Sequence, residues 1–146
     1  MKALTISQPF ASLIASGEKW VENRTWETLY RGPLAIHAGK GTQYLTRLEL
    51  AQYPTSCIVA VARLVACYHL DSLDATRTHE KLHSYDLTIG EILRHKHAEG
   101  PFCWILANVR KLAEPVHCRG ALGLWDVPAE LVKHVMIESP DKHRST

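Results

Sequence analysis

The sequence has few of the features that mark a membrane, secreted or metal-binding protein. No stretch approaches the run of about 20 apolar residues that crosses a bilayer. Near the start, Lys2 is followed by an apolar run that breaks at Ser7-Gln8-Pro9, too early for a secretory signal. The four cysteines are widely spaced without a C-x-x-C pair, so we expect reduced, mostly buried thiols. These absences favour a cytoplasmic protein with no metal, no redox cofactor and no membrane partner.

Length and composition are those of a small globular protein. The chain has 146 residues, of which 46% are hydrophobic and 22% charged, enough for one hydrophobic core. The net charge of +2 neither requires nor excludes nucleic acid, because a local basic patch matters more than the total. There is no internal repeat or low-complexity segment. We expect a single domain over residues 1–137 and a flexible polar tail over residues 138–146.

The apolar pattern predicts many short strands and a few short helices. Gly17 is expected to end the first helix and Pro128 to start the last one. Expected strands cover residues 3–6, 20–26, 34–38, 57–70, 102–109 and 122–127, with an extended stretch over 111–118 interrupted at Pro115; expected helices cover 10–16, 42–52, 88–95 and 130–136. Strands do not alternate with long helices, so an α+β, mainly β fold fits best. We predict a mixed β-barrel or half-barrel with short peripheral helices.

One motif could suggest a metal. His79-Glu80-Lys81-Leu82-His83 matches H-E-x-x-H, which on a helix places two zinc ligands on one face with a glutamate as base. The flanking residues are polar, however, and offer no buried helix to hold a metal. A chain with nine histidines also matches such a pattern easily by chance. We interpret this segment, like His95-Lys96-His97, as a solvated loop or surface helix.

The stretch from Gln8 to Lys40 carries the strongest functional signal. Lys19, Glu22 and Arg24 lie between an apolar helical segment and an apolar strand. On a strand, Glu22 and Arg24 share one face and Lys19 falls on the other. Lys19 can therefore meet Glu22 only from a turn before the strand, or across a bulge.

Aromatic and cationic side chains are interleaved along this stretch, as a binder of single-stranded nucleic acid or nucleotides needs. Ring faces stack on bases, cations hold phosphates, and a carboxylate beside a guanidinium can read a base edge. The candidate binding residues are Gln8, Lys19, Trp20, Glu22, Arg24, Tyr30, Arg31 and Lys40. The alternative is a structural salt bridge of Glu22 with Lys19 or Arg24.

Several segments resemble the ASCH domain, a member of the PUA-like superfamily, over roughly residues 3–127. The specific parts are the G-x-K-x-x-E-x-R core from Gly17 to Arg24 and the preceding Gln-Pro-aromatic-Ala; residues 30–38, 100–106 and 120–125 also agree. The resemblance implies a PUA-like β-barrel with helices at its rim. It also implies a cleft where the Gln-Pro helix, the K-x-x-E-x-R strand and the following strand meet, and RNA- or nucleotide-linked roles.

Some relatives in this family are enzymes. One branch hydrolyses the amide of an acetylated cytidine with a Lys and a Thr at K-x-x-T-x-R and a later Glu. Lys19 and Arg24 match that branch, but Glu22 stands where the Thr would be. The expected strand over residues 57–65 carries Arg63 as its only charged residue and so offers no counterpart of the later Glu. We therefore expect an RNA-, nucleotide- or nucleoside-binding protein. The alternatives are a hydrolase, either amidohydrolase-like or a ribonuclease, with Lys19 as base and Glu22 as proton shuttle, and a protein-interaction domain whose charge cluster is purely structural.

Overall fold

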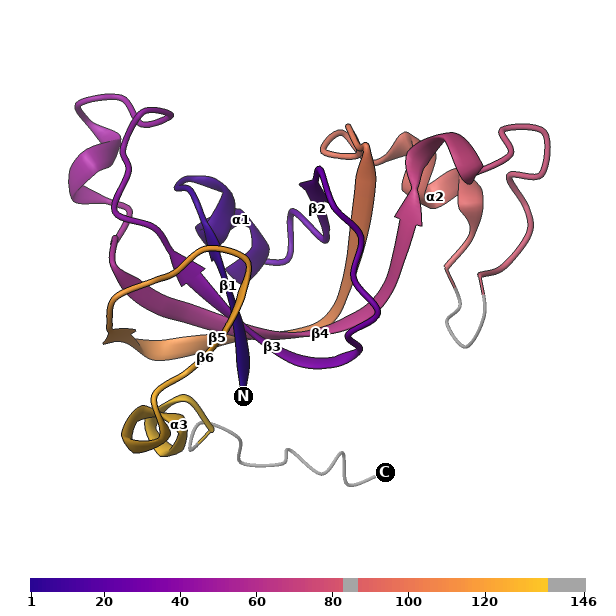
Figure 1. Ribbon diagram of the computed structural model, residues 1–146. Coiled ribbons are helices and arrows are strands. Elements are labelled where there is room, and N and C mark those ends of the chain that lie inside the picture. Colours follow the sequence, from indigo (N-terminus) through magenta and orange to yellow (C-terminus); the bar gives the residue numbers. More distant parts are fainter. Residues whose placement is uncertain (83–86, 137–146) are drawn as a thin grey trace, which may run out of the picture. The chain divides into compact units, whose positions relative to one another are not determined.

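The computed structural model describes residues 1–82 and 87–136, where the chain forms a mixed six-stranded sheet and three short α-helices (Figure 1). The strand order is β2-β5-β4-β3-β1-β6. The predicted α+β, mainly β class is confirmed. No helix among these residues is long and apolar enough to cross a bilayer. The expected tail over residues 138–146 lies outside the described residues.

The chain divides into two compact units. Unit 1 comprises residues 1–18, 33–62 and 108–146, and unit 2 comprises residues 19–32 and 63–107. Two long strands, β4 (Cys57–His69) and β5 (Phe102–His117), contribute residues to both units. The single domain expected over residues 1–137 stays a prediction.

The strands of unit 1 include the predicted segments near residues 3–6, 34–38 and 122–127. Strand β1 (Lys2–Ile6) runs parallel to β3 (Gly32–Ala38) and antiparallel to β6 (Leu124–Asp126). The middle of β3 is fully buried, which explains why its sequence is apolar without alternation. Because β1 and β3 are parallel, their last residues, Ile6 and Ala38, pair with each other, and the carboxyl ends of the two strands lie side by side.

Two helices pack in unit 1. Helix α1 (Phe10–Ala15) has only six residues and buries Ala11, Ile14 and Ala15. Gly17, with φ +86°, follows its end and donates a backbone hydrogen bond to Ile14 O, as predicted. Helix α3 (Ala129–Met136) follows Pro128. Its Val135 is buried in one cluster with residues of β1, β3, β4 and β5, namely Ala3, Ala35, Ile58, Val61 and Leu112.

Unit 2 places β2 (Val21–Arg24) antiparallel to the first residues of β5, with Glu22 opposite Trp104. Its core joins Val21 and Ile105 to Ile92 of α2 (Ile89–Arg94). Thr88 Oγ1 accepts a hydrogen bond from Glu91 N at 3.2 Å, so the helix expected over residues 88–95 is present and begins with a capped first turn. Leu70–Ser72 forms a short 3-10 helix, η2, directly after β4.

The predicted helix over residues 42–52 is wrong. This segment contains only a 3-10 turn, η1 (Glu49–Ala51). Leu48, which the helical pattern placed on the apolar face, is 82% exposed. Tyr44 packs edge-on against Phe10, with ring centroids 5.5 Å apart, but this ring contact alone does not provide the packed face that a helix of this length needs for its stability.

The predicted interruption at Pro115 is also wrong, because β5 continues through it to His117. Within the described residues, β2 pairs with β5 only over residues 102–105. The edge of β5 that β2 occupies there therefore stays open at Pro115, and a proline without an N–H is tolerated on an open edge.

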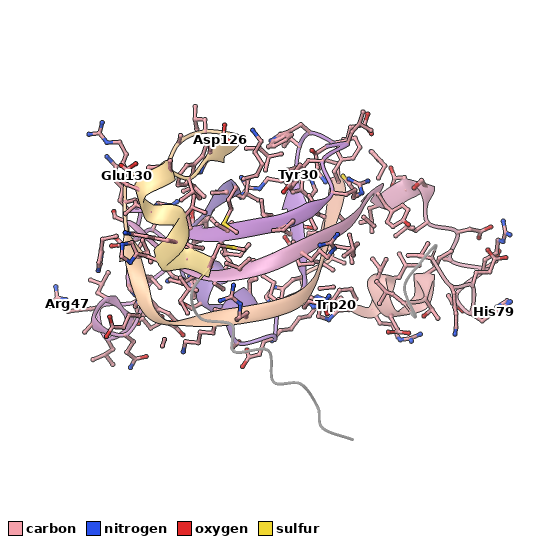
Figure 2. The ribbon with its side chains drawn as sticks, turned by 90° about the horizontal axis from the view of Figure 1, so that it is seen from below. Trp20, Tyr30, Arg47, His79, Asp126 and Glu130 are labelled. Atoms are coloured by element: carbon pink, nitrogen blue, oxygen red, sulfur yellow. The ribbon has the colours of Figure 1, made fainter. Side chains whose placement is uncertain are left out.

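The H-E-x-x-H segment does not form a helix over residues 79–82. His79 is exposed in a turn (Figure 2), and Lys81 forms an isolated bridge with Thr88. His83 lies outside the described residues. Within residues 1–82 and 87–136, no group of three or more metal-ligating side chains is present.

All four cysteines lie in the described part of the chain and are free thiols. Burial raises the pKa of each thiol, which favours the protonated, unreactive form.

Candidate functional site

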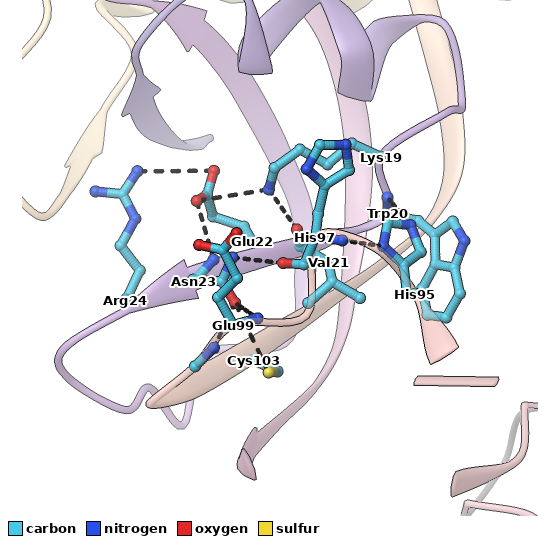
Figure 3. A network of polar contacts seen from close by, with 11 residues as sticks. Lys19, Trp20, Val21, Glu22, Asn23, Arg24, His95, His97, Glu99 and Cys103 are labelled. Carbon is cyan, nitrogen blue, oxygen red and sulfur yellow. Dashed lines mark hydrogen bonds and ion pairs between the residues drawn. The ribbon is translucent and has the colours of Figure 1, made fainter. Parts of the chain in front are cut away.

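The charges of the K-x-x-E-x-R segment meet in unit 2. Strand β2 begins at Val21, so Lys19 lies outside it, in the irregular segment between the turn at residues 16–17 and the strand, and reaches the carboxylate despite the parity of the strand. Lys19 Nζ lies 3.7 Å from Glu22 Oε1 and donates a hydrogen bond to Val21 O (Figure 3). Arg24 Nη2 lies 4.0 Å from Glu22 Oε2. Lys19 thus precedes the strand as expected, although it lies in irregular chain and not in a turn, and Glu22 and Arg24 lie on a shared face.

Burial sets the electrostatics of this charge cluster of Lys19, Glu22 and Arg24. Lys19 is 3% exposed and Glu22 7%. Burial lowers the pKa of Lys19 because it penalises the ammonium ion; the Glu22 carboxylate opposes this effect, and the Arg24 guanidinium adds to it. The lysine therefore loses its proton more easily than an exposed lysine does.

The two carboxylate oxygens of Glu22 have different surroundings. Oε1 accepts a hydrogen bond from Asn23 N at 3.0 Å and faces Lys19. Oε2 is buried and has no hydrogen-bond partner among the described residues, with Arg24 at ion-pair distance only. A buried carboxylate oxygen normally accepts hydrogen bonds. Glu22 Oε2 thus retains acceptor capacity for an N–H or O–H donor.

Asn23 fixes β2 to the segment before β5, and sequence reasoning did not single it out. Its Oδ1 accepts hydrogen bonds from Glu99 N at 2.9 Å and Gly100 N at 2.8 Å. Its Nδ2 donates to His97 O at 2.6 Å (Figure 3). The available signal was that asparagine is disfavoured inside strands, so one in β2 calls for a specific partner.

The predicted aromatic and basic residues of unit 2 have local contacts. The half-buried Trp20 ring packs edge-on against His95, with ring centroids 4.4 Å apart. Arg31, at the surface, donates to Thr28 O and Tyr30 O, each at 2.8 Å. These contacts hold the side chains in defined positions at the borders of the segment that carries the charge cluster.

Gln8 and Lys40 belong to unit 1. Gln8 is fully buried, and its amide donates to Pro54 O at 2.8 Å and accepts from Ser12 N at 2.9 Å. These bonds join the start of α1 to the segment that precedes β4. Lys40 is exposed just after β3.

Comparisons with known proteins agree with this fold. No curated protein matches the chain. The crystal structure of a mutant ZmASCH protein from Zymomonas mobilis is 16% identical with a TM-score of 0.56, over 94% of this chain and 96% of that one. The crystal structure of ASCH from the same organism is 17% identical with a TM-score of 0.54, over 90% of each chain. At this identity the likeness shows a shared fold, and the fold expected from the sequence is confirmed.

The family comparison covers most of the chain. The family model that matches is described as the ASCH domain, and it matches residues 4–116. This range contains both the K-x-x-E-x-R segment and Asn23 with its partners. The chain belongs to the ASCH domain family.

Proposed function

We propose that the protein binds RNA, or a nucleotide or nucleoside derived from it, through the charge cluster in unit 2. The observation that carries the proposal is Glu22 Oε2, a buried carboxylate oxygen with no hydrogen-bond partner among the described residues and with two cations beside its carboxylate. A base edge offers the N–H donors that such an acceptor recognises. Membership of the ASCH family supports a nucleic-acid-linked role.

The residues of unit 2 have distinct roles in this proposal. Glu22 accepts a hydrogen bond from a base N–H, and Lys19 keeps its carboxylate charged and oriented. Arg24, which is partly exposed, and Arg31, which is exposed, contact phosphates. Trp20 or Tyr30 supplies a stacking face.

A hydrolase acting on a modified nucleoside or on RNA is the second candidate. It is favoured by the lowered pKa of Lys19, because a buried lysine that gives up its proton can act as a general base. Glu22, 3.7 Å away, would then shuttle the proton. Turnover of N4-acetylcytidine or cleavage of RNA that is lost in Lys19→Ala would establish this activity; no turnover by the wild-type protein would exclude it for these substrates.

Binding of short single-stranded RNA, followed by fluorescence anisotropy, tests the first proposal. We expect Glu22→Gln and Arg24→Gln each to weaken binding about tenfold or more, because a hydrogen bond to a charged group contributes about 1.5–3 kcal/mol. The matched controls are Glu18→Gln and Arg47→Gln, which change exposed charges of unit 1 and should bind as the wild type does.

Thermal melting of the same variants separates recognition from a structural role. Unchanged RNA affinity in Lys19→Ala, Glu22→Ala and Arg24→Ala would refute the site. If Glu22→Ala also lowered the melting temperature, the cluster would be a structural clamp in a protein-interaction domain.

A further inference from the structure

We propose that unit 1 contains a second ligand site, which binds a small phosphate monoester of about the size of a nucleoside monophosphate. The site is a cavity of about 750 Å³ between the ends of β1 and β3 and the loop over residues 118–122 that precedes β6. Ligand pockets commonly have volumes of about 300–1,000 Å³. Its lining residues all belong to unit 1 and include none of the charge cluster. The proposal is therefore independent of the RNA site.

The charge of the lining favours an anion. Lys40, His117 and Arg119 line the cavity, and none of its lining residues in the described part of the chain is acidic. Lys40 and Arg119 are exposed, and neither has an ion-pair partner within residues 1–82 and 87–136. The arginine fork can hold two phosphate oxygens at once, and the lysine adds a point charge. Two permanent cations fit the double charge of a phosphate monoester.

Hydrogen bonds fix the backbone that carries these two cations. His37 is buried, and its Nε2–H donates to Cys118 O at 2.8 Å, while Cys118 N donates to Ser56 O at 3.1 Å. Both backbone groups of Cys118, its N–H and its C=O, are therefore hydrogen-bonded, which fixes the residue before Arg119. Gly39 N donates to Ile6 O at 2.9 Å, which holds the residue before Lys40 in the same way. A fixed backbone lowers the entropy cost of binding.

The loop lies so close to the sheet that glycine is needed at position 120. A Cβ at Gly120 would lie 2.5 Å from Thr5 Oγ1 and 2.8 Å from His37 Cε1, closer than real contacts allow. Trp125 Nε1–H donates to Thr5 Oγ1 at 3.0 Å, and Thr5 Oγ1 lies 3.2 Å from His37 Nδ1. Because His37 Nε2 donates to a carbonyl, Nδ1 of the neutral ring accepts from the Thr5 hydroxyl. This chain of hydrogen bonds forms one wall of the cavity.

The remaining lining suits the organic part of such a ligand. Leu122 is 98% exposed at the cavity, and Ala121 lies beside it. An exposed leucine next to two cations offers apolar contact for a sugar or base. Ser56 supplies a hydroxyl for a polar group of the ligand.

Titration calorimetry with AMP, adenosine and inorganic phosphate tests the proposal on the full chain. We expect AMP to bind the wild type, and Lys40→Gln and Arg119→Gln each to weaken it about tenfold, because both residues are exposed and their loss should not affect folding. Adenosine should bind at least tenfold more weakly than AMP. The matched control is Arg47→Gln, which changes an exposed cation of unit 1 (Figure 2). Arg47 does not line the cavity, so this variant should bind AMP as the wild type does.

The Trp125 indole N–H provides a local readout, because it is bonded to a residue of the cavity wall. Its proton–nitrogen NMR signal, assigned with Trp125→Phe, should shift on addition of AMP in the wild type and in Arg24→Gln. Phosphate alone should shift it at higher concentration if the anion dominates recognition. No saturable AMP binding, equal affinity for AMP and adenosine, or unchanged AMP affinity in Arg119→Gln would each overturn the proposal.

Discussion

One side chain, Asn23, satisfies three backbone groups of the segment between α2 and β5. Replacing it with alanine leaves two N–H groups and one carbonyl without this partner. An unsatisfied buried group costs about 1–3 kcal/mol, but some of these three backbone groups can form hydrogen bonds to water instead. We therefore expect Asn23→Ala to lower the free energy of unfolding by about 2–4 kcal/mol. Urea unfolding measures this loss.

The control for this prediction is Gln43→Ala, which removes an exposed amide from unit 1 and should leave stability within about 0.5 kcal/mol of the wild type. Asn23→Asp keeps the acceptor for Glu99 N and Gly100 N but loses the donor to His97 O. It should therefore be destabilised less than Asn23→Ala. Equal stability of wild type and Asn23→Ala would contradict a stabilising role for the three hydrogen bonds of Asn23.

The neighbours of Asn23 show what sequence can predict about single residues. Lys19, Glu22 and Arg24 are close in the chain, so strand parity alone predicted which of them share a face and which one needs a turn. The partners of Asn23 lie 74 to 77 residues away and are backbone groups, which have the same chemistry at every position. The hydrogen bonds of Asn23 therefore left no signal in the sequence beyond an asparagine inside a strand.

At the scale of elements, the same apolar pattern led to different structures. The patterns over residues 42–52 and 130–136 both predicted a helix. In α3, Val135 packs with Ala3 and Ala35 of the sheet, and the helix forms. Leu48 has no comparable partner among the described residues, and only a 3-10 turn forms. Periodicity predicts which face could be buried, while tertiary packing decides whether it is.

His37 connects three elements of unit 1 and makes their packing sensitive to pH. It lies on β3 and bonds the loop at Cys118, and Thr5 of β1 links it to Trp125 of β6. Burial lowers its pKa, and the hydrogen bond to Cys118 opposes this only in part. The unfolded chain, with a histidine pKa of about 6.5, therefore takes up the proton first as the pH falls.

We expect the stabilising contribution of His37 to be complete above about pH 6.5 and to be lost progressively as the pH falls below that value. Urea unfolding of the wild type and His37→Gln between pH 5 and 8 should show a stability difference that shrinks toward pH 5. His134→Gln, which changes an exposed histidine of α3, is the control. A difference between wild type and His37→Gln that does not vary with pH would contradict this account.

For the whole molecule, the sequence predicted the strands better than their order. The long apolar run after Cys57 predicted a long strand, and β4 has 13 residues. Nothing local indicated that β2 pairs with β5, because Val21 and Ile105 lie 84 residues apart and pair through backbone groups. Periodicity predicted the fold class but not the strand pairing, and the resemblance to ASCH domains was the only sequence signal that carries long-range pairings with it.

The small net charge of the whole chain makes a quantitative prediction about the proposed RNA site. With a net charge of +2, the attraction of the protein as a whole for RNA is weak, so binding must rest on a few local contacts. Each phosphate neutralised on a single strand contributes about −0.7 to the slope of log K against log salt concentration. If Arg24 and Arg31 each contact one phosphate, the wild-type slope should be about −1.4.

Measuring RNA affinity between low and moderate salt then separates phosphate contacts from base recognition. Arg24→Gln and Arg31→Gln should each reduce the magnitude of the slope by about 0.7. Glu22→Gln should weaken binding at every salt concentration and leave the slope nearly unchanged, because a hydrogen bond to a base releases no counterion. Arg47→Gln should change neither quantity. A wild-type slope of about −4 or steeper would require many more phosphate contacts than these two arginines supply, and would place the main RNA surface elsewhere on the protein.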